Sequence, residues 1–102
     1  MRLISEARIR EYCLRYPDAK SALLVFVKIV RKATWHDLKE ARKTYPHADA
    51  VKVSSGSIAT VFNVRGSRYR LIVAIHYNRQ LIYVLRFLTH AEYDKDAWKE
   101  EL

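Results

Sequence analysis

The sequence predicts an α+β domain in which helices come first and an antiparallel sheet follows. Two observations lead to this fold class. Apolar residues recur with the helical period of about 3.6 as far as residue 46 and with the strand period of 2 after it. The later apolar runs are also separated by short polar links, and such links join only neighbouring antiparallel strands. The 102 residues fit one domain, residues 1–102.

The N-terminal half begins with a short strand over residues 1–4. Ser5 is a suitable N-cap for a helix that runs to about Arg15, where Tyr16-Pro17 stops it. Asp18 is expected to cap a second helix. The apolar residues of that helix follow a helical stripe that faces the core, namely Leu23, Phe26, Val27 and Val30.

A third helix and a meander of four strands complete the predicted fold. Thr34, with Asp37 three residues later, resembles a capping box that opens a helix through Lys43, and Tyr45-Pro46 ends it. The runs rich in Val, Ile, Tyr and Phe that follow predict strands at residues 50–53, 58–64, 68–77 and 81–88. Thr89 is expected to cap a short C-terminal helix.

Composition excludes several classes of protein. With 50% hydrophobic and 12% aromatic residues, the chain is too apolar for a disordered basic tail. The longest apolar run is six residues, 22–27, whereas a membrane-spanning helix needs about 20, and the first residues carry no signal-peptide core. Cys13 is the single cysteine, so no disulfide or thiolate metal cluster is expected. These features favour a cytoplasmic protein that needs no metal or cofactor.

The positive charge is concentrated in one part of the chain. Nineteen basic against eleven acidic residues give a net charge of +8. Residues 50–91 contain no carboxylate and six basic side chains: Lys52, Arg65, Arg68, Arg70, Arg79 and Arg86. Five of these are arginines, whose planar fork matches phosphate oxygens. The simplest partner is nucleic acid, although exposed arginines on strands can also serve only to keep a protein soluble.

Strand alternation predicts which of these side chains share a face of the sheet. In the run 68–77, Arg68, Arg70 and His76 point away from the core, while Tyr69, Leu71 and Val73 point into it. Two arginines two residues apart are separated by about 7 Å, close to the spacing of successive phosphates. If Arg86 in the next strand lies beside Arg70, three guanidinium groups converge.

The segment after the last strand contains groups suited to acid–base chemistry. His90, Glu92 and Tyr93 follow Thr89 at the expected start of a helix, where free N–H groups can also hold a phosphate. Beside arginines, an imidazole, a carboxylate and a phenol can cleave an RNA phosphodiester without a metal ion. Structural alternatives remain open: Glu92 can simply complete a capping box, Tyr93 can belong to the core, and His90 can be a helix-end residue.

Almost the whole chain resembles the HigB branch of the RelE-like toxins of bacterial toxin–antitoxin systems. The most specific parts of the resemblance are the stretch from Phe62 to Leu71 and the segment Thr89-His90-Ala91-Glu92-Tyr93-Asp94. The resemblance implies a RelE-like fold and a metal-independent endoribonuclease that cleaves mRNA on the translating ribosome. It also implies inhibition by a HigA-type helix-turn-helix antitoxin encoded beside the toxin.

The resemblance implies site residues at matching positions of this sequence. It places Arg68, Arg70, His90, Glu92 and Tyr93 at or near the active site. We expect the catalytic groups to be His90, Glu92, Tyr93 and Arg70. RNA-binding roles are expected for a further set of side chains, namely Arg68, Arg86, His76, Arg79 and Lys52.

Two other functions are compatible with the same residues. In the first, the arginine face belongs to a non-catalytic RNA- or ribosome-binding module, which would bind with strong salt dependence and leave RNA uncut. In the second, the basic surface serves only to bind an acidic protein partner. Primer extension on translated message distinguishes the nuclease from both.

Overall fold

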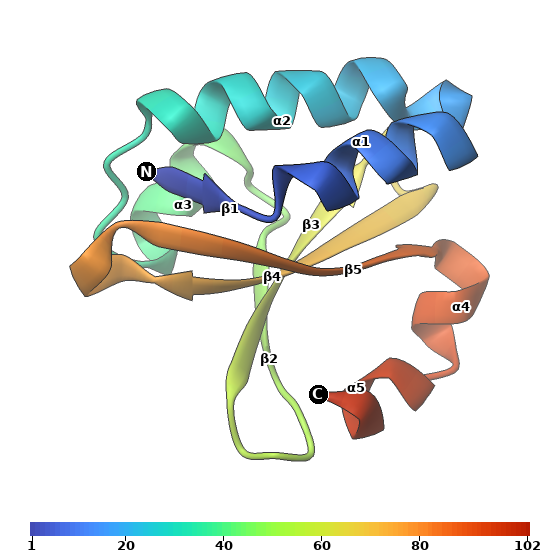
Figure 1. The fold of residues 1–102 in the computed structure, drawn as a ribbon. Helices are drawn as coiled ribbons and strands as arrows, with labels where there is room; N and C mark the ends of the chain where they lie inside the picture. Colours follow the sequence, from blue (N-terminus) through green and yellow to red (C-terminus); the bar gives the residue numbers. More distant parts are fainter.

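The computed structural model describes residues 1–102 and is built on one twisted five-stranded sheet with strand order β1-β5-β4-β3-β2 (Figure 1). The strands are β1 (Arg2–Ile4), β2 (Asp49–Lys52), β3 (Ile58–Val64), β4 (Tyr69–His76) and β5 (Leu81–Thr89). The helices are α1 (Glu6–Arg15), α2 (Lys20–Lys32), α3 (Leu38–Thr44), α4 (His90–Asp94) and α5 (Ala97–Glu101), with short 3₁₀ turns η1 (Pro17–Ala19) and η2 (Tyr77–Arg79). The predicted α+β class is confirmed.

Two features of the sheet and its C-terminal cover differ from the predicted antiparallel meander with one final helix. Strands β2 to β5 form the meander, but β1 pairs with β5 in parallel, so the sheet is mixed. The chain ends in two short helices, α4 and α5, which break at Asp96 in a left-handed conformation. No helix combines the length and apolar character needed to cross a membrane.

The two faces of the sheet carry separate hydrophobic clusters. We call the face covered by α1 and α2 the helix face, and its cluster includes Phe26, Val30, Leu71 and Val84. We call the opposite face the C-terminal face, because Trp98 of α5 packs there with Val61 and Ile72. Figure 1 shows α1 and α2 together on one side of the sheet and α4 and α5 at the other. Side chains on the two faces therefore meet different surroundings.

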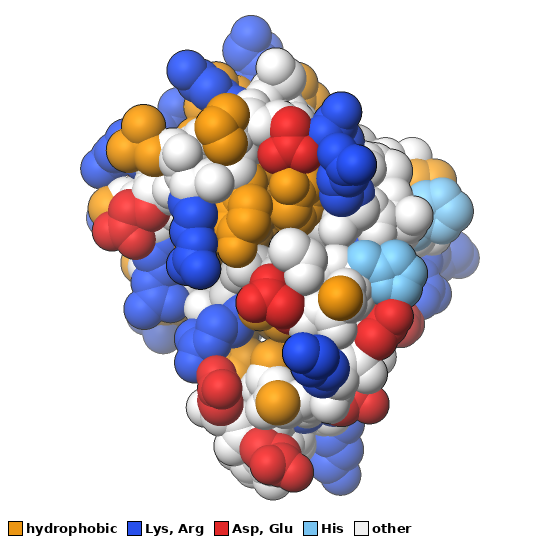
Figure 2. Space-filling model, turned by 90° about the vertical axis from the view of Figure 1, so that its right-hand side faces the viewer, with side chains coloured by type: hydrophobic (Ala, Val, Ile, Leu, Met, Phe, Trp, Pro, Cys, Tyr) orange, Lys and Arg blue, Asp and Glu red, His pale blue; other side chains and the backbone are white.

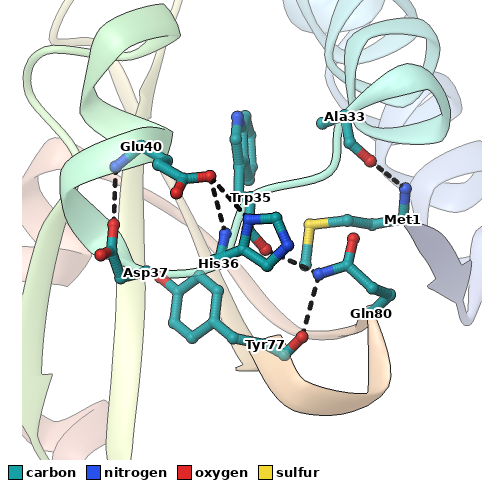
Figure 3. Close-up of polar contacts among 8 residues, drawn as sticks. All are labelled: Met1, Ala33, Trp35, His36, Asp37, Glu40, Tyr77 and Gln80. Carbon is teal, nitrogen blue, oxygen red and sulfur yellow. Dashed lines mark hydrogen bonds and ion pairs between the residues drawn. The ribbon is translucent and has the colours of Figure 1, made fainter.

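The third helix starts later than predicted. It begins at Leu38, and its N-cap is Asp37, whose carboxylate accepts a hydrogen bond from the Glu40 N–H at 2.9 Å (Figure 3). Trp35 lies in the preceding loop, which is tied to η2 because the Gln80 side-chain amide donates to the Trp35 carbonyl at 2.7 Å. The predicted Thr34 cap is wrong because the Asp37 carboxylate, directly before the first helical turn, accepts the capping hydrogen bond instead.

Of the two other predicted caps, Ser5 occupies the N-cap position of α1 but makes no capping hydrogen bond, and Asp18 is wrong because the N-cap of α2 is Ala19. Ser5 precedes α1 but adopts a left-handed conformation with φ of 72°, and its side chain caps nothing. Asp18 lies in η1 rather than at the start of α2, and its carboxylate binds side chains from the β3–β4 turn instead.

A bulge in β5 changes which side chains share a face. Ile72 pairs with Arg86 and Val73 pairs with Val84, so Leu85 is an extra residue in β5. The Arg8 guanidinium donates to the Val84 and Leu85 carbonyls at 3.2 and 3.0 Å, which gives these carbonyls partners at the bulge.

The bulge interrupts the simple alternation of side chains along β5. The side chains of Ile82 and Val84 lie on the helix face. After the extra residue Leu85, the next side chain on that face is Phe87. Arg86, which pairs with Ile72 across the strands, consequently points to the C-terminal face.

Candidate functional site

The candidate site lies at one end of the sheet, where the turn between β3 and β4 meets the junction of β5 and α4. Thr89 pairs with Tyr69 across the strands, and the His90 backbone N–H donates to the Arg68 carbonyl at 2.9 Å. This backbone contact brings the arginines of the turn next to the first residue of α4. The sheet register therefore gathers groups that lie about twenty residues apart in the sequence.

The carboxylate of Asp18, which the sequence did not predict as a site residue, lies at this end of the sheet. Asp18 accepts hydrogen bonds from Arg65 at 2.5 Å, from Arg68 at 3.2 Å and from the Tyr69 hydroxyl at 2.8 Å. The Tyr69 hydroxyl, followed by the two guanidinium groups, lowers the pKa of Asp18, and the same hydrogen bond raises the pKa of Tyr69. No local pattern in the sequence signals this contact, because Asp18 and Arg65 lie 47 positions apart.

We expect Asp18→Asn to lower the stability of the protein at neutral pH, and we expect this difference to decrease progressively as the pH falls below the unfolded carboxyl pKa of about 3.9. A carboxyl group whose pKa is lowered by folding stabilises the fold above its unfolded pKa of about 3.9, and this contribution disappears as pH falls through the folded pKa. Thermal unfolding of both proteins between pH 3 and 7 measures the difference.

Glu100→Gln is the matched control for the Asp18 variant, because Glu100 is exposed and has no hydrogen bond or ion pair. Its melting temperature should follow that of the unmodified protein across the range. A constant difference between Asp18→Asn and the unmodified protein at all pH values would contradict the role of the ionised carboxylate.

Arg68 and Arg70 do not stand side by side on a strand as predicted. The strand β4 begins at Tyr69, so Arg68 belongs to the turn and its guanidinium faces Asp18. Arg70 lies on the C-terminal face, where its guanidinium is 5.3 Å from the centre of the Tyr93 ring and donates to the Ser67 carbonyl at 2.5 Å. The two arginines thus flank the end of the sheet from different faces.

Tyr93 connects Arg70 to the C-terminal helices. Its ring stacks on Trp98 at 5.4 Å between centroids, and the Trp98 indole N–H donates to the Tyr93 carbonyl at 3.1 Å. Burial is the main cause that raises the pKa of Tyr93, with a smaller contribution from Asp49, while Lys99 and Arg70 oppose it. Tyr93 is therefore half-buried and keeps its proton at neutral pH.

Arg86 shares the C-terminal face with Arg70 because of the bulge in β5. Its cross-strand partner is Ile72, two residues along β4 from Arg70. Its guanidinium forms an ion pair with Glu101 at 3.4 Å and borders a hollow of ≈ 240 Å³ that Glu92 and Trp98 also line. Arg86 therefore shares a face with Arg70 but does not lie directly beside it, since Arg70 pairs with Leu88, and Arg86 is partly neutralised by an acidic side chain. The three guanidinium groups do not converge, because Arg68 faces Asp18.

His90 is held by one ring nitrogen and exposes the other. Its Nδ1 lies 2.8 Å from an Asp94 carboxylate oxygen one helical turn later, and both side chains are more than half exposed. Nε2 has no protein partner among the hydrogen bonds and ion pairs of the structure. A carboxylate on Nδ1 fixes the orientation of the imidazole and leaves Nε2 free to exchange a proton with a bound molecule.

Three of the backbone N–H groups at the start of α4, where a phosphate site was expected, are already bonded within the protein. Thr89 and Glu92 form a complete capping box, in which Glu92 Oε1 accepts from the Thr89 N–H at 3.0 Å and Thr89 Oγ1 accepts from the Glu92 N–H at 3.2 Å. The His90 N–H is bonded to Arg68. The structure thus gives Glu92 the capping contact that the sequence left as an alternative.

Comparison with known proteins identifies the family of this chain. The family model described as the HigB toxin, a RelE-like toxic component of a toxin–antitoxin system, matches residues 19–96. The chain belongs to this family. The mRNA interferase HigB of Escherichia coli O6:H1 is 28% identical over 95 residues, which cover 93% of this chain and 90% of that protein. The mRNA interferase toxin HigB of Escherichia coli K12 is 26% identical over 94 residues, covering 92% and 88%.

The structure of this HigB family member brings some of the predicted site residues together and leaves others apart. His90, Glu92, Tyr93, Arg68, Arg70 and Arg86 lie around the end of the sheet that carries α4. His76 and Arg79 lie at the other end of β4, about 23 Å along the strand from Tyr69. Lys52 points to the helix face, because its neighbour Val51 packs on the C-terminal face.

The surface around α4 and α5 in this toxin is not uniformly positive. Figure 2 views the molecule from that end and shows lysine and arginine side chains interleaved with acidic ones and with exposed hydrophobic side chains. The one-sign stretch of residues 50–91 is thus partly neutralised in space by Asp18 from η1 and Glu101 from α5. Arg70 and the free side of His90 have no acidic partner and are therefore available to a substrate.

We expect Thr89→Ala to destabilise the protein by about 1 kcal/mol, because alanine removes the oxygen that caps α4. The Glu92→Gln variant is the matched control, since glutamine can still accept from the Thr89 N–H and complete the box. Urea unfolding measures both. A Thr89→Ala variant with unchanged stability would show that the capping box does not hold α4 in place.

Proposed function

We propose that this chain is the toxin of a toxin–antitoxin pair and cleaves mRNA on the translating ribosome without a metal ion. The observation that carries the proposal is the position of His90, whose Nδ1 is fixed by Asp94 and whose Nε2 is free next to the arginine turn. The relatives named mRNA interferase support the choice of substrate. Such a substrate requires that the protein acts in the cytoplasm.

The proposed reaction is attack of a ribose 2′-oxygen on the neighbouring phosphorus. His90 Nε2 takes the 2′-OH proton, the new P–O bond forms, and the bond from phosphorus to the 5′-oxygen breaks. The products are a 2′,3′-cyclic phosphate and a 5′-hydroxyl. We assign the base to His90 rather than Glu92, because the Glu92 carboxylate is already engaged by the Thr89 N–H.

Tyr93 supplies the proton for the leaving 5′-oxygen in this proposal. Burial raises its pKa, so the phenol is protonated before the reaction. Arg70, 5.3 Å from the ring centre, then faces both the phenolate and the phosphate, and its charge stabilises the negative charge that builds up in the transition state. Arg68 binds a flanking phosphate when it exchanges its exposed contact with Asp18 for the substrate.

Neutralisation by an antitoxin is the second part of the proposal. A toxin that arrests growth by cleaving mRNA must be inhibited in growing cells, and membership of a toxin–antitoxin family supplies the partner class. We propose a HigA-type helix-turn-helix antitoxin.

Primer extension on a message with and without a functional start codon tests the proposed activity. Expression of the chain should produce 5′ ends inside the reading frame of the translated message and none in the untranslated one. Cleavage of both messages would contradict the proposed dependence of cleavage on the ribosome. Intact message, together with salt-dependent RNA binding, would instead support the non-catalytic binding module.

A further inference from the structure

The largest hollow of the molecule lies between α2, the end of α3 and the end of β3, and we call it the α2–β3 hollow. Its volume is ≈ 400 Å³, within the range of about 300–1,000 Å³ typical of small-molecule sites. Five of its eight lining residues are hydrophobic, and none is acidic. The residues that matter below are Val25, Phe26, Tyr45 and Arg65.

Two aromatic side chains form part of the wall of the hollow. The rings of Phe26 and Tyr45 lie 5.7 Å apart between centroids, and both pack on the buried ring of Phe62, at 5.1 and 5.3 Å. Their positions are therefore fixed by the core. Val25 also lines the hollow and is 53% exposed, so the hollow is open to solvent. An open apolar hollow with fixed aromatic rings suits a flat aromatic ring system.

Arg65 is the only charged residue that lines the hollow. Its Nη1 donates to Asp18 Oδ2 at 2.5 Å, and its side chain is 46% exposed. A guanidinium group has five N–H donors, so donors remain for a ligand. Arg65 and Arg68 also bring two positive charges to the single negative charge of Asp18. The ligand that fits best is therefore an aromatic ring system that carries a negative charge.

The backbone holds Arg65 in a conformation that arginine rarely adopts. Its φ is 54°, in the left-handed region where residues other than glycine are uncommon. Residues held in such conformations cluster at ligand sites. Glycine would relieve this strain, as it does at Gly66, the next residue, where φ is 66°. An arginine at this position points to a role of its guanidinium group.

The β3–β4 turn connects the hollow to the candidate site. Arg65 and Arg68 both donate to Asp18 Oδ2, and the Arg68 carbonyl accepts a hydrogen bond from the His90 N–H. Figure 1 shows this turn beside the end of α2 at which that helix begins. Two guanidinium groups that share one oxygen lie close enough for neighbouring phosphates of one strand. A strand bound at Arg68 can therefore continue to Arg65.

We propose that the α2–β3 hollow binds a nucleotide of the message that flanks the cleaved bond. The base enters the hollow and stacks on Tyr45, and its phosphate binds Arg65. The inference rests on the proposed function. It adds a second binding subsite, outside the cleaved nucleotides, and assigns Arg65 to it.

Other occupants fit the observations less well. An apolar side chain of a protein would fill the hollow but leave the remaining donors of Arg65 without an acceptor. A nucleotide of ribosomal RNA has the required chemistry, but the continuity from Arg68 to Arg65 favours the strand that is cleaved beside His90. The message satisfies the hollow, the charge and the position.

The first test combines Val25→Glu with messages that contain one abasic nucleotide at successive positions around the cut. A carboxylate at the hollow opposes entry of the base and its phosphate. On programmed ribosomes, Val25→Glu should raise the half-saturating protein concentration by about 5- to 150-fold, the value of one stacked base. One abasic position should cause the same loss with the unmodified chain and no further loss with Val25→Glu.

Ile58→Glu is the matched control for Val25→Glu. Ile58 is also an exposed large hydrophobic side chain, at 56%, and lies in β3 outside the hollow lining. Its half-saturating concentration should equal that of the unmodified chain. Because Val25 is exposed, the Val25→Glu variant should fold normally, which circular dichroism checks.

The second test uses Arg65→Gly and a message with an uncharged methylphosphonate linkage beside the sensitive base. Glycine adopts the positive φ without strain, so the turn should be kept. Arg65→Gly should weaken binding of the normal message but not of the methylphosphonate message, and the rate at saturation should stay within a few-fold. Lys39→Ala controls for the lost charge, since Lys39 is exposed on α3 and forms no ion pair.

The remaining outcomes overturn the inference in distinguishable ways. Unchanged half-saturation in both variants would exclude the hollow. A loss in folded Val25→Glu that couples to no abasic position would assign the hollow to ribosomal RNA or protein. Normal cleavage, combined with failed rescue by the protein encoded beside this gene, would assign it to the antitoxin.

Absence of cleavage by the unmodified chain would reject the proposed function but not yet the hollow. The same abasic and methylphosphonate oligonucleotides would then be titrated against the chain alone by fluorescence anisotropy. Coupling of one abasic position to Val25→Glu would support the subsite without the nuclease. Absence of coupling would reject both.

Discussion

The His90→Ala variant should cleave mRNA about 10²–10⁴-fold more slowly than the unmodified chain, the loss typical of a general acid–base group. Nε2 is the part of this side chain that is free to accept the 2′-OH proton, and alanine removes it. Growth arrest should disappear with the cleavage. Quantitative primer extension on a translated message, at equal protein levels, measures the effect.

The loss should occur without unfolding. The contact between His90 Nδ1 and the Asp94 carboxylate is exposed on both sides, and such surface contacts contribute about 0–1 kcal/mol to stability. His47→Ala is the matched control, because His47 is an exposed histidine in the loop before β2 and makes no side-chain hydrogen bond. If the cleavage rate of the His90→Ala variant were within a few-fold of that of the unmodified chain, His90 would not be the general base and the proposed active site would be wrong.

The Arg70→Ala variant should lower cleavage by about 10²–10³-fold, the cost of removing one preorganised group that stabilises the transition state. Its guanidinium lies at the Tyr93 ring on the C-terminal face and has no acidic partner to neutralise it. Arg70→Lys should recover part of the activity, because lysine keeps the charge but loses the planar fork that binds two phosphate oxygens.

Lys39→Ala is the control for the loss of one positive charge, since Lys39 is exposed on α3 and forms no ion pair. Single-turnover cleavage on purified programmed ribosomes separates the chemical step from binding. A decrease confined to ribosome affinity, with an unchanged rate at saturation, would make Arg70 a binding residue and contradict its role in the transition state.

Most secondary-structure elements could be predicted from the sequence because they depend on neighbours within a few residues. Tyr16-Pro17 and Tyr45-Pro46 end helices close to the predicted positions, and the change of period after Pro46 marks the start of the meander. The N-caps were less accurate. Thr34 and Asp37 offer similar capping chemistry, and packing of Trp35 into the core, at 6% exposure, favours the later start.

The alternation of side chains along a strand predicts the faces of β4 correctly but not those of β5. In β4 the prediction is confirmed, since Tyr69, Leu71 and Val73 are buried in the cluster of the helix face. In β5 one extra residue, Leu85, reverses the pattern and turns Arg86 to the same face as Arg70. A bulge depends on the partner strand and here also on the Arg8 guanidinium, so no pattern within residues 81–88 predicts it.

The sequence by itself determined the helices, the meander, the basic character of residues 50–91 and the capping box at Thr89, because each depends on composition or on residues close together in the chain. Only the tertiary structure decided which charges are free. Asp18 meets Arg65 and Arg68, and Glu101 meets Arg86, across long sequence separations. The physical reason is that an ion pair depends on distance in space, which the packing of whole elements sets and no local pattern records.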